Sequence, residues 1–255
     1  KEEVDLDEGV NDPGIFKAVF LAGGPGSGKS FVVGKTALTA LGFKLINSDD
    51  AFEAQLKKVG LKPTPEDIYS PKGQEVRARA VALTGMKRKL ALNGRLGLVI
   101  DGTGKDYPKI KRQADELTEI GYDIAMIFVN TDLKTAQARN KNRERTLPED
   151  EVEKMWNAVQ RNIDNGRFQK QFKQDFIVID NSEGVRDFDA AIMAAYKRMS
   201  SWVKKAPKRP AAKQWIRDAQ AAKQRGMKEE KEEKEEEKIV HDNCGTPECC
   251  GQCDT

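Results

Sequence analysis

The chain has 255 residues, of which 33% are charged, and its 44 Lys and Arg against 41 Asp and Glu leave a net charge of +3. This length suits one domain of about 150–200 residues with an appendage. No apolar run approaches the ~20 residues of a membrane span, and no basic-then-apolar leader is present, so we expect no membrane-embedded part and no signal peptide.

Apolar runs alternate with amphipathic segments from residue 14 onward. In chain order they predict a strand at 14–22, a helix at 29–41, a strand at 43–47, a helix at 50–59, a proline-rich loop or lid-like insertion at 60–73, a long helix that ends near Asn93, a strand with a turn at 96–104, a helix at 108–120, a strand at 122–130, helices at 132–143 and 149–165, a strand at 176–180 and a helix at 186–204. This alternation predicts an α/β fold, in which helices cover both faces of a parallel sheet.

Composition divides the chain into four predicted parts. Residues 1–13 form an acidic arm, 14–204 the α/β domain, 205–238 a linker with a charged, polar helix, and 239–255 a tail rich in Cys and His. Because all four cysteines lie in that tail, the body is not a disulfide scaffold, and we expect a reducing compartment such as the cytoplasm.

Residues 23–30, GGPGSGKS, match the phosphate-binding pattern GxxxxGK[ST] between a predicted strand and a predicted helix. We expect these residues to cradle the phosphates of ATP: Gly23, Gly24, Pro25, Gly26, Ser27, Gly28, Lys29 and Ser30. Lys29 is expected to reach the β- and γ-phosphates, and Ser30 to ligate Mg²⁺. The alternatives are a chance glycine-rich turn and a nucleotide-binding protein that no longer catalyses.

Asp49 and Asp50 follow the second predicted strand, in the stretch LINSDDAF. Ligands of α/β sheets gather at the carboxyl ends of the strands, and a kinase needs a carboxylate there to accept the proton of the attacking hydroxyl. We therefore expect Asp49 to be the catalytic base, with Asp50 as a structural helper. The alternative is that one of the two aspartates caps the helix that follows.

Two further groups of residues complete the predicted site. Asp101 ends the third strand, where it is expected either to hold a Mg²⁺-bound water or substrate, or to bond to nearby backbone amides. Arg139, Arg143 and Arg145 surround a helix end, and we expect them to form a lid that stabilises the transferred phosphoryl group. A solvated basic surface is the alternative.

The order of the P-loop, INSDD, VIDGTG and ARNKNRERTLP resembles that of the P-loop kinases that include phage polynucleotide 5′-hydroxyl kinases and zeta-toxin-like kinases. The resemblance covers roughly residues 15–200. It implies a three-layer fold with a five-stranded parallel sheet, ATP and Mg²⁺, a base at Asp49 and lid arginines at Arg139 and Arg143. These kinases often place a basic residue shortly after the acidic pair, where this chain has Ala51-Phe52-Glu53.

The favoured function is therefore ATP-dependent transfer of the γ-phosphate to a hydroxyl group of a nucleic-acid end or of a small molecule such as a nucleotide sugar. The alternative is a kinase-like ATP-binding component of a larger assembly, such as a phage particle, with the tail as its anchor. In that case the protein is phage-encoded or associated with a virion.

The tail sequence HDNCGTPECCGQC holds the single histidine and all four cysteines of the chain. Their short spacings, with turn residues between them, predict a structural Zn²⁺ site that docks a partner protein. Its candidate ligands are His241, Cys244, Cys249, Cys250 and Cys253. Disulfides and a free, unstructured tail are the alternatives.

Overall fold

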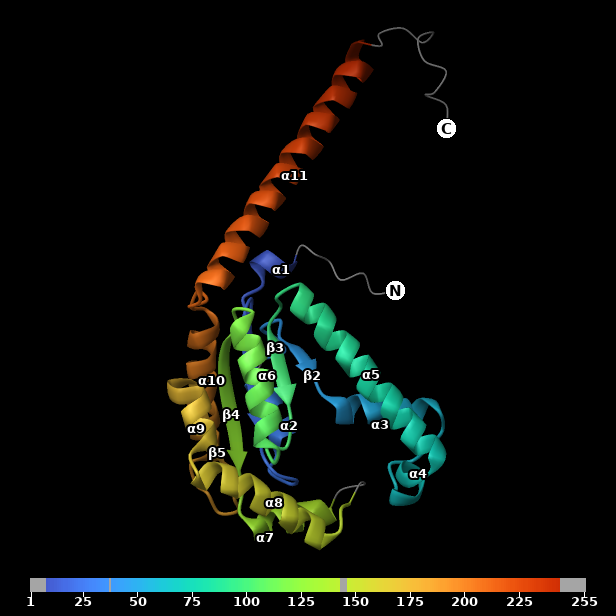
Figure 1. The fold of residues 1–255 in the computed structure, drawn as a ribbon, viewed down its shortest axis with the longest axis vertical. Coiled ribbons are helices and arrows are strands. Elements are labelled where there is room, and N and C mark those ends of the chain that lie inside the picture. Colours follow the sequence, from blue (N-terminus) through green and yellow to red (C-terminus); the bar gives the residue numbers. More distant parts are fainter. Residues whose placement is uncertain (1–7, 37, 143–145, 244–255) are drawn as a thin grey trace. The chain divides into compact units, whose positions relative to one another are not determined.

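A computed structural model describes residues 8–36, 38–142 and 146–243, with side chains from Val10 to Glu229. Five strands form one parallel sheet in the order β2-β3-β1-β4-β5 (Figure 1). The strands are β1 (Lys17–Ala22), β2 (Lys44–Ile46), β3 (Leu98–Asp101), β4 (Asp123–Asn130) and β5 (Phe176–Asp180). The predicted α/β fold with a five-stranded parallel sheet is confirmed.

Helices α2 to α9 and η1 lie between successive strands, whereas α1 precedes β1 and α10 and α11 follow β5 (Figure 1). They are α1 (Glu8–Asn11), α2 (Lys29–Lys35), α3 (Ser48–Lys58), α4 (Pro65–Tyr69), α5 (Pro71–Asn93), α6 (Tyr107–Glu119), α7 (Leu133–Lys141), α8 (Glu149–Asp164), α9 (Arg167–Phe172), the short 3₁₀ helix η1 (Lys173–Asp175), α10 (Phe188–Val203) and α11 (Pro210–Asn243).

The core lies on both faces of the central strand β1, whose six residues are all buried. On one face Val19 and Leu21 pack in a cluster with residues of α2 and α10. On the other face the ring of Phe20 lies 5.3 Å from that of Phe172, between centroids. A strand buried on both sides needs a continuous apolar sequence, which KAVFLA provides beyond its first residue.

Among the element boundaries that differ from the sequence prediction, two have a local cause that the structure shows. The first strand begins at Lys17 rather than at residue 14, because a turn over Asp12–Phe16 places Phe16 at φ 55°. The helix predicted at 29–41 ends at Lys35. There the hydroxyl of Thr36 donates to the carbonyls of Val32 and Val33, and this local bond competes with continued helix.

The sequence predicted a proline-rich loop or lid-like insertion at residues 60–73. The structure shows that this segment contains α4 and the start of α5. Pro65 and Pro71 occupy the first turns of these helices, where a missing N–H group costs nothing. Thr64 and Ser70 cap them by accepting backbone N–H groups. The short helix α9 was also missed by the sequence prediction.

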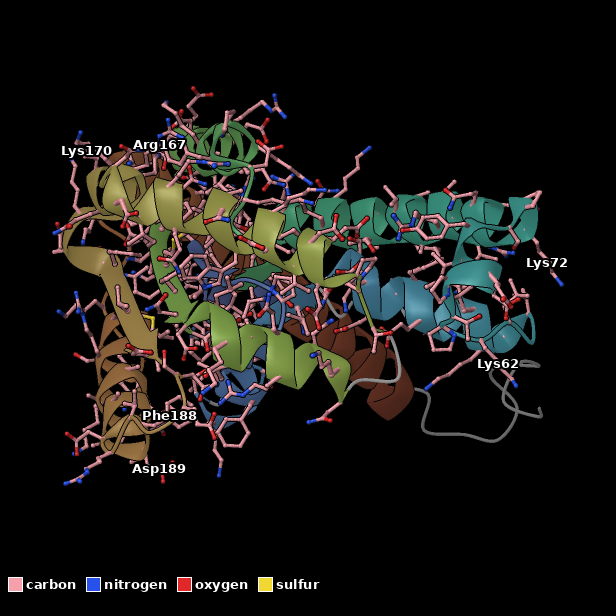
Figure 2. The ribbon with its side chains drawn as sticks, turned by 90° about the horizontal axis from the view of Figure 1, so that it is seen from below. Lys62, Lys72, Arg167, Lys170, Phe188 and Asp189 are labelled. Carbon is pink, nitrogen blue, oxygen red and sulfur yellow. The ribbon has the colours of Figure 1, made fainter. Side chains whose placement is uncertain are left out.

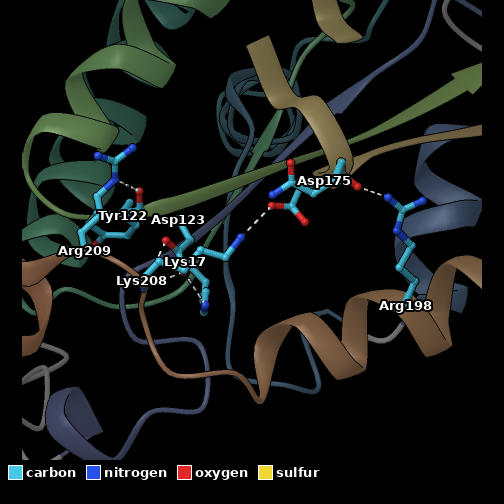
Figure 3. A network of polar contacts seen from close by, with 8 residues as sticks. Lys17, Tyr122, Asp123, Asp175, Arg198, Lys208 and Arg209 are labelled. Atoms are coloured by element: carbon cyan, nitrogen blue, oxygen red, sulfur yellow. Dashed lines mark hydrogen bonds and ion pairs between the residues drawn. The ribbon is translucent and has the colours of Figure 1, made fainter. Parts of the chain in front are cut away.

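A polar network holds the segment after α10 against the amino ends of the central strands (Figure 3). The buried ammonium of Lys17 lies 2.7 Å from the Asp123 carboxylate and 4.9 Å from the centre of the Trp202 ring. The backbone N–H of Lys208 donates to the same carboxylate, and its side chain pairs with Asp175. Breaking such a buried pair is costly, so residues up to 208 are fixed to the sheet.

The chain divides into two compact units, residues 1–212 and 213–255. The helix predicted at 211–238 is present as α11 and continues to Asn243. Among the described residues, no helix is both long and apolar enough to cross a membrane. The division into four functional parts stays a prediction.

Candidate active site

The P-loop connects β1 to α2 and leaves several polar groups without a partner. The Lys29 ammonium donates to the Gly23 carbonyl over 2.7 Å, which closes the loop. Within the described part of the chain, the backbone N–H groups of Gly26, Gly28 and Ser30 donate no hydrogen bond, and the buried Ser27 hydroxyl has no partner. Unpaired donors in a turn before a helix fit a bound phosphate.

Glycine is required at two positions of the loop for reasons that the structure shows. Gly26 has φ 75°, and a Cβ there would lie 2.6 Å from the Ala136 carbonyl oxygen. Gly28 has φ 85°, and a Cβ there would lie 2.4 Å from the side-chain nitrogen of Asn181. The loop therefore depends on both backbone freedom and close packing.

We expect Gly28→Ala to weaken ATP binding at least tenfold and to destabilise the fold by about 1–2 kcal/mol, because alanine is strained at this φ. Gly34→Ala, in the same helix, is the control: a Cβ there meets nothing within 4 Å. That change should stabilise the fold by about 0.5–1 kcal/mol. Calorimetric titration with ATP and urea unfolding measure both effects, and equal ATP affinity in the two variants would contradict the role of Gly28.

Two side chains from distant parts of the chain contact the P-loop. Asn181, which follows β5, donates to the Ser27 carbonyl over 2.7 Å. Arg139 in α7 donates to the Gly26 carbonyl over 3.3 Å and to the Asn181 side chain. Arg139 therefore lies at the loop, where the sequence predicted a lid residue, whereas Asn181 was missed. Only the position of Asn181 at the end of a strand pointed to it.

Asn47 organises the carboxylates at the ends of β2 and β3. Its side-chain oxygen accepts the N–H groups of Asp49 and Asp50 and thereby caps α3, while its side-chain nitrogen donates to Asp101 over 2.9 Å. The expectation that an aspartate caps this helix is wrong, because Asn47 takes that position. Neither the Asp49 nor the Asp50 carboxylate is therefore used as the helix cap.

The carboxylates and Lys29 are close enough to influence one another. Burial raises the pKa of Asp101, the Lys29 charge opposes this, and the charges of Asp50 and Asp49 raise the pKa further. Partial burial also raises the pKa of Asp50, with the Asp49 charge as the second cause, while the Asn47 side chain and Lys87 lower it. The site therefore concentrates negative charge beside the phosphate loop.

The chemistry of Asp101 and Ser30 fits a Mg²⁺ ion. One oxygen of Asp101 is buried and has no partner among the described residues. β1 and β3 pair in register at Leu21 and Asp101, which places Asp101 beside the start of the P-loop. Magnesium prefers hard oxygen ligands such as carboxylate and hydroxyl groups, and Asp101 and Ser30 could supply them.

Helices α7 and α8 lie beyond the carboxyl ends of the strands, and Figure 2 shows α8 across this edge. Trp156 of α8 donates to the Thr131 carbonyl over 2.7 Å, and the buried Asn162 donates to the Gly104 carbonyl over 2.8 Å. These bonds tie α8 to the loops that follow β4 and β3. The cover over the candidate site is thus fixed at two points.

Several predicted site residues lie outside the described parts of the chain. Among them are the lid residues Arg143 and Arg145 and the tail residues Cys244, Cys249, Cys250 and Cys253. His241 belongs to α11, but its side chain is not described. Among the described residues, no group of three or more His, Cys, Asp or Glu is arranged to hold a metal ion. The zinc site stays a prediction.

Several solved structures are similar to this chain. A chain from the AvrRxo1-ORF1:-ORF2 complex with ATP is 16% identical and has a TM-score of 0.50, over 70% of this chain and 61% of that chain. A structure from the PezAT toxin–antitoxin system of Streptococcus pneumoniae (13%, TM-score 0.48, 78% and 94%) and a gluconokinase from Sinorhizobium meliloti (16%, 0.43, 73% and 95%) also match. At these identities the likeness shows the fold alone.

No curated protein matches the sequence. A family model described as an AAA domain matches residues 19–164, which is more than half of the chain and includes the P-loop, the acidic pair and Asp101. The chain therefore belongs to this AAA domain family, as a P-loop ATP-binding protein of the kinase type.

Proposed function

We propose that the protein transfers the γ-phosphate of Mg²⁺-ATP to a hydroxyl group of a small molecule or a nucleic-acid end. The observation that carries this proposal is that the P-loop, the acidic pair and Asp101 follow neighbouring strands of the sheet, with the Asn47 side chain bonded to Asp49, Asp50 and Asp101. A phosphoryl donor and a proton acceptor are both needed there.

Each residue has a role in this proposal. Lys29 and the loop amides bind the β- and γ-phosphates, and Ser30 and Asp101 hold Mg²⁺, which neutralises charge on the phosphates. Asp49 accepts the proton of the attacking hydroxyl, and Asp50 supports it. Arg139, which already contacts the loop at Gly26, stabilises the charge that develops on the transferred group.

Transfer from ATP labelled at the γ-phosphate tests the function. The acceptors are 5′-hydroxyl DNA and RNA, nucleosides and nucleotide sugars. Label should move to one acceptor class and should require Mg²⁺. Release of label to water alone, with every acceptor unlabelled, would argue for a nucleotide-binding component instead. Anchoring of the tail in a larger assembly, such as a phage particle, stays a prediction, because residues 244–255 lie outside the described chain.

We expect Asp101→Asn to stabilise the protein without ligands and to impair transfer. Because the folded state raises the pKa of Asp101, its ionised form destabilises the fold at neutral pH. The gain from asparagine should therefore be full above the raised pKa and vanish as the pH falls to the ordinary carboxyl range. Urea unfolding at pH 7.5 and 3.5 measures it, and a loss of stability at neutral pH would contradict the argument.

A further inference from the structure

A pocket of about 290 Å³ opens beside the acidic pair. Its lining comes from the end of β2, the start of α3 and the middle of α5: Leu45, Asn47, Asp50, Ala51, Leu83, Thr84 and Lys87. The pocket therefore shares Asn47 and Asp50 with the carboxylate cluster of the candidate active site.

The order of the strands places this pocket on the acceptor side. The P-loop follows β1, Asp101 ends β3, and the pocket lies at β2, the next strand in the sheet. Asn47, which lines the pocket, connects it to the end of β3 by donating a hydrogen bond to Asp101. A molecule in the pocket would thus face the carboxylates from the side away from the phosphate loop, where the attacking hydroxyl is needed.

Lys87 is the one cation in the lining of this pocket. It is exposed on α5, and its charge acts on the Asp50 carboxyl group. Within the described part of the chain Lys87 forms no ion pair, whereas its neighbour Arg88 pairs with Glu116. An ammonium group that forms no close ion pair with a protein carboxylate is available to an anionic ligand.

The rest of the lining limits what the ligand can be. Leu45, Ala51 and Leu83 are apolar, and the Thr84 hydroxyl already donates to the Ala80 carbonyl, so it can only accept a further bond. None of the described lining residues is aromatic, which leaves a nucleic-acid base without a stacking partner. The volume lies at the lower end of the range for ligand pockets. A polyhydroxylated compound of about monosaccharide size fits these limits.

We propose that Lys87 selects, as the phosphoryl acceptor, a small hydroxyl compound that carries a carboxylate or phosphate group. The anionic group lies at Lys87, and the hydroxyl that attacks ATP lies at the carboxylate pair. This assignment rests on the proposed function.

Matched acceptor pairs test the proposal with ATP labelled at the γ-phosphate. The pairs are glycerol and D-glycerate, D-glucose and D-gluconate, D-glucose and D-glucose 6-phosphate, and uridine and 3′-UMP. In at least one pair, the anionic member should be phosphorylated with a kcat/KM at least about tenfold above that of the neutral member. Lys87→Ala should remove this preference and Lys87→Glu should reverse it. Lys89→Ala, which changes an exposed lysine of the same helix outside the pocket, should retain it.

Four results would overturn the assignment if the chain still binds ATP. The first two are equal kcat/KM values within every pair and a preference for the anionic member that survives Lys87→Ala. The other two are no transfer to any anionic member and a kcat/KM for a 5′-hydroxyl oligonucleotide above that of every small acceptor. Failure of the wild-type chain to bind ATP would instead refute the proposed function. The pocket is then judged by the ¹⁵N shifts of Thr84 and Lys87 during titration with the same anions. Shift changes that Lys87→Ala abolishes would support the pocket, and their absence would reject it.

Discussion

Replacement of Lys29 by alanine is expected to weaken binding of Mg²⁺-ATP by ~10- to 10²-fold and to abolish phosphoryl transfer. Hydrogen bonds that involve a charged partner contribute about 1.5–3 kcal/mol, and each ~1.4 kcal/mol is a factor of ten. Lys29 is also held in place before ATP arrives, since its ammonium lies 2.7 Å from the Gly23 carbonyl. The lysine is therefore preorganised at the entrance of the loop.

Arg139 is a second cation that could compensate for the loss of Lys29. Its guanidinium also reaches the loop, at the Gly26 carbonyl, so a second cation remains when Lys29 is removed. If Arg139 could replace it, the Lys29→Ala variant would keep measurable ATP affinity, and Lys29→Ala with Arg139→Ala would be needed to abolish it. We expect the single change to suffice, because the Arg139 guanidinium is already engaged by the Gly26 carbonyl and the Asn181 side chain.

Lys35→Ala is the matched control for Lys29→Ala. Lys35 belongs to the same helix, and its ammonium lies 5.4 Å from the centre of the Phe31 ring rather than at the loop. Calorimetric titration with Mg²⁺-ATP should give wild-type affinity for this variant. Unchanged affinity in Lys29→Ala itself would rule out the cradle as the nucleotide site.

The phosphate loop could be predicted from sequence because its residues are adjacent in the chain and its chemistry is local. Asn181 could not, since its bond to the Ser27 carbonyl joins residues 154 positions apart. The helix α4 was missed for a different reason: prolines end helices in their interior but begin them at the first turn, and composition alone does not separate these cases. The alternation of strands and helices was enough to predict the parallel sheet.

For the acidic pair, the sequence defined the two possible roles but could not choose between them. A carboxylate beside a helix start is either a cap or a reactive group, and the sequence left both open. The structure gives the cap to Asn47, whose side chain accepts the N–H groups of Asp49 and Asp50. It also places Asp50, rather than Asp49, in the lining of the pocket. Which carboxylate takes the proton depends on a substrate position that no sequence pattern contains.

Asp49→Asn is expected to bind ATP normally and to lose transfer by ~10²–10⁴-fold, because asparagine keeps the shape of the side chain but cannot accept the proton. Asp50→Asn is the matched variant, one residue away in the same helix turn, and it should lose less. Rates under saturating ATP and separate ATP titrations distinguish catalysis from binding. A greater loss in Asp50→Asn would transfer the role of base to Asp50, which already lines the pocket.

The pH dependence of the two variants distinguishes these roles further. A general base works only when ionised, so kcat/KM falls as the pH drops through its pKa. Burial and the Asp49 charge both raise the pKa of Asp50, and Asp49→Asn removes only the second of these causes. If the residual activity of Asp49→Asn comes from Asp50, that activity should still show an acidic limb, and adding Asp50→Asn should abolish the limb. Residual activity without an acidic limb would mean that Asp50 does not act as a substitute base, and that the remaining activity comes from binding and phosphate stabilisation alone.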